Sequence, residues 1–485
     1  MVERRRENLF LKNIGSWVDD VVKAVSPRAG YRRMAYRFGY DILDRSRLRT
    51  KRTGLVGTGD QQLTADALDK LRNICRDMGR NNPLVTGILR VEANGVVGTE
   101  TQIQARTADD EWNAAAEQLW DDLMIARACD VTGRFNFHAL LKKLFLSYRR
   151  DGDAFVLFLD DSLQAIEGEE CGTPWGSKND AINFDVYNGV AFSKQTKRVI
   201  GYYIGKRNKW GYIRNEDYQK YPADVVHHLF NTERFSCSRG EPALTSSVHF
   251  IDQLCGYIDA ELVASKINAC WPMMTRTYAA EGLPRGYTGG VSATGKTEDE
   301  KPIDKIEPGQ IWHGTAPGEE IKAIGAARPP SAFDSFVLRM LAFIGRPLCL
   351  PSMLITGDFS GATYMNARIA YQEARENWKD EQNLVLKPFI RRVWLWKLAK
   401  WIERRDLTPR DDWKKHEIWC KRWPYVNPYQ EADADKLQLA NGTMTRTEIC
   451  ARQGRDFRDV TDERAKEEEY LQTKKVILVA EKVLK

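Results

Sequence analysis

Three features are scarce in this 485-residue sequence: paired cysteines, long apolar runs, and positive charge beyond the N-terminal segment. Its 9 cysteines are scattered from Cys75 to Cys450 without a CxxC pair, which indicates neither a zinc site nor a disulfide framework. Free thiols suit a reducing compartment. No stretch approaches the roughly 20 apolar residues of a membrane span, and the one after Arg4-Arg5-Arg6 is too short for a signal peptide. We expect a protein made and used in cytoplasm, or in something assembled there, without a membrane partner.

The positive charge is concentrated at the N-terminus. Residues 1–52 contain 14 Lys and Arg against 6 Asp and Glu, a net charge of +8, whereas the whole chain carries +6. The main body is therefore slightly acidic, and a phosphate-binding surface over all of it is not indicated. The basic arm is either a solvated tail or a contact for nucleic acid or another partner, and its composition leaves both open.

The first half of the chain is typical of an α+β region. Apolar periodicity predicts helices over 63–97, with a break at Asn82-Pro83, and over 110–150. Short β-rich runs separated by turn residues predict strands at 154–159, 183–187, 199–204 and 225–230.

The pattern changes near residue 244. Apolar and small residues recur at heptad spacing from Val248 to Ala269, which predicts a helix that ends near Trp271-Pro272. The apolar face from Phe333 to Ile344 predicts a second helix over 331–345. The segment between these helices is rich in Gly, Pro and charge, with short β pieces.

A long helical stretch is expected from Ala362 to about Arg404, with a kink at Pro388. After residue 411 we expect a β-like piece at 417–419. Three short helices should follow, beginning near Pro428, Thr445 and Val460.

One segment fits a nucleotide-binding pattern but lacks its context. The residues from Gly290 to Thr297 satisfy GxxxxGK[ST], the P-loop whose backbone amides cradle phosphate. A P-loop lies between a buried strand and a helix N-terminus. Here a Pro- and Gly-containing stretch precedes the motif, and an acidic stretch that leads to Pro302 follows it. We therefore expect no nucleotide and no other cofactor.

Carboxylates near the strand at 154–159 leave an alternative function open. Asp151, Asp153 and Asp160 flank it, and metal-dependent nucleases hold cations with carboxylates on and beside strands. The alternative is a metal-dependent nuclease or recombinase on this central β region, although polar strand ends explain the same pattern. His227 and His228 are neighbours in a strand, so they should point to opposite faces and share no metal. No catalytic triad can be picked out by spacing, and we expect neither catalysis nor a metal site.

The most specific pattern begins at Leu354. The run Leu354-Ile355-Thr356-Gly357-Asp358-Phe359-Ser360-Gly361-Ala362-Thr363-Tyr364, followed by Ala367-Arg368, resembles the LxTGDFSGxxYxxAR signature of lambda-like phage portal proteins. Other similar segments keep that family's order and lie at 79–83, 239–242, 259–267 and 306–309. The resemblance spans roughly residues 65–445.

The resemblance implies a portal fold of the α+β class that assembles into a ring-forming homo-oligomer, usually of twelve subunits. Such a subunit has a wing, a two-helix stem, a small β-containing clip, a long wing helix and a helical crown. The implied boundaries are a basic N-terminal arm at 1–53, the wing at 54–243, stem helix 1 at 244–272, the clip at 273–330, stem helix 2 at 331–346, a tunnel loop at 347–362, the long wing helix at 363–403, and the wing remainder and crown at 404–485.

The same resemblance implies a non-enzymatic role in the virion. The ring would sit at one capsid vertex, pass double-stranded DNA during packaging and ejection, and dock the terminase large subunit and the head-tail adaptor or neck protein. The major capsid and scaffold proteins would be further partners, with assembly in the host cytoplasm. The implied site residues are Thr356, Gly357, Asp358, Phe359, Ser360 and Gly361 in the tunnel loop, Asp252, Asp259, Lys266 and Arg339 facing the channel or neighbouring subunits in the stem, and Glu307, Trp312, Glu319 and Glu320 at the clip's docking surface.

Overall fold

The structure is a computed structural model that describes residues 57–99, 101–174, 184–269, 333–361, 363–421, 423, 428–452, 455 and 457–474. Its described residues form two compact units. One contains the residues up to Val248 and those from Gly345 onward, and the other lies between His249 and Ile344. The N-terminal arm at 1–53, the P-loop-like segment from Gly290 to Thr297, and the clip with Glu307, Trp312, Glu319 and Glu320 lie outside the described residues.

The first helices end and begin where the sequence predicts. After the short α3 (Gly59–Gln62), the helix α4 (Ala65–Asn81) and α5 (Pro83–Val96) meet at Asn82. The Asn82 side chain accepts hydrogen bonds from the backbone N–H groups of Leu84 and Val85, at 3.0 and 3.4 Å. Pro83 occupies the first helical position, where its missing N–H costs nothing. The predicted break at Asn82-Pro83 is therefore a helix cap between two separate helices.

The next helices pack beside a small sheet. The helix α6 (Asp110–Ile125), the 3₁₀ turn η2 (Arg127–Cys129) and α7 (Phe137–Asp151) replace the single predicted helical region. The strand β1 (Gln102–Ala105) pairs antiparallel with β9 (His416–Trp419), so residues about 310 positions apart form one ladder. The sequence predicted β9 but not β1, because a four-residue strand with two Gln residues has little β character of its own.

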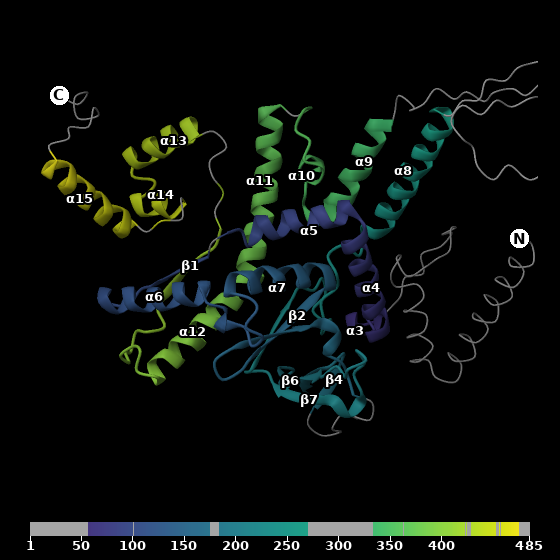
Figure 1. Ribbon diagram of the computed structural model, residues 1–485, viewed down its shortest axis with the longest axis horizontal. Helices are drawn as coiled ribbons and strands as arrows, with labels where there is room; N and C mark the ends of the chain where they lie inside the picture. The colour runs from purple at the N-terminus through teal and green to yellow at the C-terminus, as the bar shows by residue number, and fades with distance from the viewer. Residues whose placement is uncertain are drawn as a thin grey trace, which may run out of the picture. The chain divides into compact units, whose positions relative to one another are not determined.

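Two antiparallel sheets follow α7. The three-stranded sheet has the order β3-β2-β8, and the four-stranded sheet has the order β4-β5-β6-β7. Their core includes Phe155, Ile204 and Val226, all buried. The bounds are β2 (Asp153–Phe158), β3 (Leu163–Glu167), β4 (Phe184–Tyr187), β5 (Val190–Ser193), β6 (Val199–Gly205), β7 (Tyr218–Pro222) and β8 (Val226–Phe230), with the 3₁₀ turns η3 (Gly168–Glu170) and η4 (Asn215–Asp217). The mixed α and β content that the sequence predicts is present (Figure 1).

The long helical stretch is interrupted earlier than predicted. The helix α11 (Tyr364–Glu381) passes into a π-helical turn, η6 (Gln382–Leu386), and then into α12 (Lys387–Glu403). The Lys387 N–H donates to the Gln382 carbonyl, five residues back. Pro388 has no N–H to continue the α pattern, and the wide turn directly before it accommodates this defect.

After β9, three helices complete the chain: α13 (Pro428–Ala440), α14 (Arg446–Arg452) and α15 (Phe457–Thr473). Their starts agree with the predictions to within three residues. No helix in the described part of the chain is long and apolar enough to cross a membrane.

The second unit is a helix pair. The helix α8 (Val248–Ala269) and α9 (Phe333–Gly345) were both predicted, and they lie side by side in Figure 1. Tyr257 on α8 contacts the rings of Phe333 and Phe336 on α9, with centroids 5.8 and 4.9 Å apart. Phe250 and Phe343 stack at 6.3 Å, so the aromatic contacts run along the pair.

Candidate functional site

The loop that carries the most specific sequence pattern is built from local turns. It leaves the short helix α10 (Ser352–Thr356), which follows the 3₁₀ turn η5 (Arg346–Leu348). Gly357 ends α10 with a φ of +70°, and its N–H donates to the Met353 carbonyl at 3.0 Å. A left-handed residue of this kind is the ordinary glycine cap of a helix. The Asp358 N–H then donates to Thr356 Oγ1 at 3.1 Å, and the Ser360 N–H donates to Asp358 Oδ1 at 2.9 Å.

The loop is exposed but not featureless. Phe359 is 44% exposed, and its ring stacks on Tyr371 of α11 with centroids 6.2 Å apart. Hydrogen bonds from the Ser360 side chain and backbone lower the pKa of Asp358, which keeps this exposed group ionised. The loop therefore presents a carboxylate, a hydroxyl and an aromatic ring to solvent, anchored on α10 at one end and on α11 at the other.

The four predicted stem residues are all exposed, and they remain candidates. Asp252, Asp259 and Lys266 recur every seven residues on α8, so they follow one another along one side of the helix. Arg339 lies on α9. Partial burial raises the pKa of Asp252, with His249 acting in the opposite direction.

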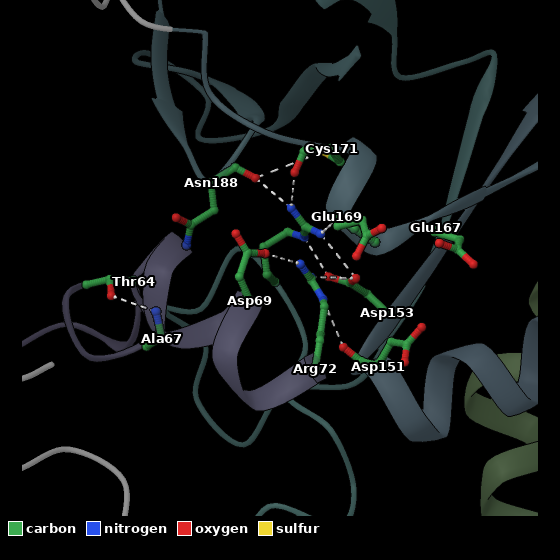
Figure 2. A network of polar contacts seen from close by, with 12 residues as sticks. Thr64, Ala67, Asp69, Arg72, Asp151, Asp153, Glu167, Glu169, Cys171 and Asn188 are labelled. Atoms are coloured by element: carbon green, nitrogen blue, oxygen red, sulfur yellow. Dashed lines mark hydrogen bonds and ion pairs between the residues drawn. The ribbon is translucent and has the colours of Figure 1, made fainter. Parts of the chain in front are cut away.

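Two of the three carboxylates of the nuclease alternative, Asp151 and Asp153, lie in a buried ion-pair network. Asp153 is fully buried at the start of β2, and it accepts hydrogen bonds from Arg72 of α4, at 3.0 Å, and from Arg239. Figure 2 shows Arg72 beside Asp153, with the carbonyl groups of Cys171 and Asn188 close by. Arg239 Nη1 donates to both of those carbonyl oxygens at 2.8 Å. Burial opposes ionisation, but Arg239 and Arg72 outweigh it and hold the pKa of Asp153 below its usual range.

Asp151 extends the same network on the other side of Gly152. Its carboxylate accepts from Arg76 at 2.8 and 3.1 Å and from Arg150 at 2.8 and 3.0 Å. Against the opposing effect of burial, these two guanidinium groups lower the pKa of Asp151. Arg76 also pairs with Glu169 of η3. The network therefore joins α4, the α7–β2 junction, η3 and the turn at Arg239, all within one unit.

The three carboxylates named for the nuclease alternative do not come together as a metal site. The oxygens of Asp151 and Asp153 point at guanidinium groups, and Asp160 lies exposed beyond the far end of β2. Among the described residues there is no group of three or more His, Cys, Asp or Glu side chains that could hold a metal ion. His227 contacts Arg392 and Phe389, whereas His228 contacts Asp153 and Phe155, so the two imidazoles do point to opposite faces.

A second buried cluster ties α11 to the helices beneath it. Arg149 of α7 binds Glu92 of α5, at 2.6 and 3.1 Å, and Glu381 of α11, at 3.0 Å. The Tyr148 hydroxyl also donates to Glu381, at 3.1 Å. The next residue, Gln382, donates to the carbonyl oxygens of Val96 and Lys421, at 2.8 and 3.1 Å.

Sequence reasoning missed both buried networks, although one signal was available. Arg72 and Arg149 fall among apolar residues at core-facing positions of amphipathic helices, next to Leu71 and Tyr148. A charge at such a position needs a buried partner. Which acid supplies the partner depends on the tertiary fold, since Asp153 is 81 residues away from Arg72.

Comparison with known proteins places the chain in a family. The sequence profile of the phage portal protein family, lambda type, matches residues 46–382, well over half of the chain. The chain therefore belongs to the lambda family of phage portal proteins, and is a structural component of a phage-type particle. The resemblance that the Leu354 segment carries is thus confirmed at the level of the family.

Individual relatives are distant. A probable portal protein of Halomonas phage phiHAP-1 is 22% identical over 458 residues, covering 87% of this chain and 84% of that protein. Among solved structures, the neck of an empty gene transfer agent particle is similar, with a TM-score of 0.42 and 15% identity over 80% of this chain and 93% of that one. A chain of the native gene transfer agent virion has a TM-score of 0.39 and 14% identity, over 80% of this chain and 93% of that one.

Proposed function

We propose that the chain forms a closed ring, usually of twelve subunits in this family, at one capsid vertex, and that DNA passes through the ring. The ring would serve packaging and ejection, and would dock the terminase large subunit and the head-tail connector. The observation that carries this proposal is the exposed loop from Thr356 to Gly361, which lies between two helices inside the region that matches the portal family.

The helix pair supports assembly. Leu262 and Val263 on α8 are 52% and 55% exposed, and Leu338 and Phe343 on α9 are 49% and 56% exposed. An isolated subunit would leave this apolar surface in water, which monomeric proteins avoid. A head-to-tail contact that covers it generates a ring when its rotation closes. In such a ring, Asp252, Asp259, Lys266 and Arg339 would face the channel or the neighbouring subunits.

The charge distribution suits a conduit. With the excess positive charge confined to residues 1–52, the rest of the chain offers DNA no strong electrostatic hold. The carboxylate of Asp358 would add repulsion at the narrowest point. The clip residues Glu307, Trp312, Glu319 and Glu320 would contact the motor and connector, and the major capsid and scaffold proteins would be further partners.

The test distinguishes a role of the loop in DNA retention from a role in ring assembly. Deleting residues 357–361 should leave rings visible by electron microscopy but reduce the DNA retained by the particles, because the loop lies outside the buried networks. Phe359→Ala is the milder variant, and Lys436→Ala on α13 is a surface control. A wild-type protein that stays monomeric at high concentration, with no axial hole in any micrograph, would contradict the ring. Loss of rings on deletion would show that the loop is part of the structural core.

A further inference from the structure

The connection between β6 and β7 exposes two aromatic side chains, Trp210 and Tyr212, to solvent. Trp210 and Tyr212 are 72% and 74% exposed, which is unusual for residues of their size. They lie in the Trp210 loop, defined here as residues 206–214. The same loop contains the exposed cations Lys206 and Lys209, and the two carboxylates of the connection, Glu216 and Asp217, lie in η4 at its end, where they bond to Arg214.

The Trp210 loop is preorganised. The Asn208 side chain accepts hydrogen bonds from the N–H groups of Trp210 and Tyr212, at 2.9 and 3.1 Å. The Asn208 N–H donates to the Tyr212 carbonyl at 2.9 Å, and Gly211 provides the left-handed turn with a φ of +82°. Exposed aromatic side chains that a closed turn fixes in place lose little conformational entropy on binding, which is characteristic of interface anchors.

The cations of the loop differ in whether they form ion pairs. At its base, Arg207 pairs with Glu167 and Glu170, each at 3.0 Å. Lys209 makes no ion pair among the described residues, and its ammonium lies 5.4 Å from the Trp210 ring centroid. The tip of the loop therefore offers a positive charge beside an aromatic surface, and a complementary partner should be acidic and partly apolar.

The same chain carries such a surface at the C-terminal end of α6. Asp121 and Asp122 lie in the last turn and are exposed, and Ile125 beside them is 77% exposed. No basic residue lies in that last turn. Carboxylates at this end add to the negative pole of the helix dipole, and the nearest basic residue along the chain is Arg127 in the following η2 turn. Partial burial and, to a smaller extent, the neighbouring Asp122 raise the pKa of Asp121.

We propose that the Trp210 loop of one subunit docks against the Asp121–Asp122–Ile125 end of α6 in a second copy of this chain. Trp210 would pack on Ile125 while Lys209 approaches the two carboxylates. A ring requires two different patches on each subunit, and α6 and the four-stranded sheet lie in different parts of their unit (Figure 1). This inference rests on the proposed ring and specifies a contact outside the helix pair of α8 and α9.

The experiment measures the subunit concentration at which half of the full-length protein is assembled, by mass photometry and sedimentation. Trp210→Ala and the double variant Asp121→Lys/Asp122→Lys should each raise that concentration more than tenfold. Arg198→Glu in the β5–β6 turn and Glu111→Lys at the other end of α6 are matched charge changes, and each should shift it less than threefold.

The decisive variant reverses the charge of both surfaces at once. Combining Lys206→Glu/Lys209→Glu with Asp121→Lys/Asp122→Lys should restore assembly to within threefold of wild type. Without restoration, or with no shift in the single-surface variants, the docking proposal is wrong while the ring stands. A wild type that forms no rings contradicts the proposed function itself.

A second measurement does not depend on these variants folding. A photo-crosslinking phenylalanine analogue in place of Trp210, in otherwise wild-type chain, should join the loop to an α6 peptide of another subunit. A crosslink to capsid shell protein, or to another part of the ring, would overturn the assignment.

Discussion

Replacing Asp153 by Asn should be among the most destabilising conservative changes in this protein. Asp153 is fully buried, and the two guanidinium groups it neutralises belong to Arg72 and Arg239, which are 2% and 1% exposed. Removing one partner from a buried ion pair leaves an uncompensated charge and costs ~3–5 kcal/mol. For a unit of this size, at ~2.1 cal/mol/K of unfolding entropy per residue, that corresponds to a fall in melting temperature on the order of 4–7 °C.

The matched control is the same Asp-to-Asn change at Asp69, another carboxylate that pairs with Arg72. Asp69 binds Arg72 at 3.2 Å, but its side chain is 58% exposed, so Asp69→Asn should cost less than about 1 kcal/mol. Both variants should be compared by urea unfolding at pH 7 under conditions in which the subunit is monomeric. Because the pKa of Asp153 is held low, the difference should be constant from pH 5 to pH 8. Equal costs for the two variants, or stabilisation of the wild type by Mg²⁺, would refute the ion-pair explanation.

Two further predictions concern other buried polar groups. Gln382→Ala should cost about 1–3 kcal/mol, because the Val96 and Lys421 carbonyl oxygens lose their side-chain donor, whereas Asn383→Ala on the exposed side should stay within roughly 0.5 kcal/mol by chemical denaturation. Burial lowers the pKa of His228 to about 4, against the opposing effect of Asp153, so its contribution to stability is complete above about pH 6.5 and lost as the pH falls toward 4. His228→Gln should reduce the loss of unfolding free energy between pH 7 and pH 5, and an unchanged slope would show that His228 is not responsible.

The elements with strong local signals were predictable from the sequence. The Asn82-Pro83 cap, the strand over Asp153–Phe158 and the helix over Val248–Ala269 each follow from residue pattern and spacing. The family could also be predicted, because the Leu354 segment and the other similar segments follow one another in the family's order. The strand β1 and the buried networks could not, since each depends on partners far away in sequence. Asp151 and Asp153 were correctly placed at a strand end, but only the fold shows that arginines occupy the position a metal would need.

The π turn between α11 and α12 has a consequence for how the long helix tolerates change. A wide turn of this kind contains one more residue than an α turn, and each residue turns an α-helix by about 100°. Upstream of it, Trp378 packs so closely on α5 that a Cβ at Gly95 would lie 2.5 Å from its ring. Downstream, Trp394 contacts Trp120 of α6 at 5.5 Å. The extra residue in η6 therefore sets the angle between the faces of α11 and α12 that carry these two tryptophans. Deleting one residue between 382 and 386 would remove the wide turn that accommodates Pro388 and turn one of the two tryptophans away from its neighbour. Substitutions there that keep the length would preserve both contacts.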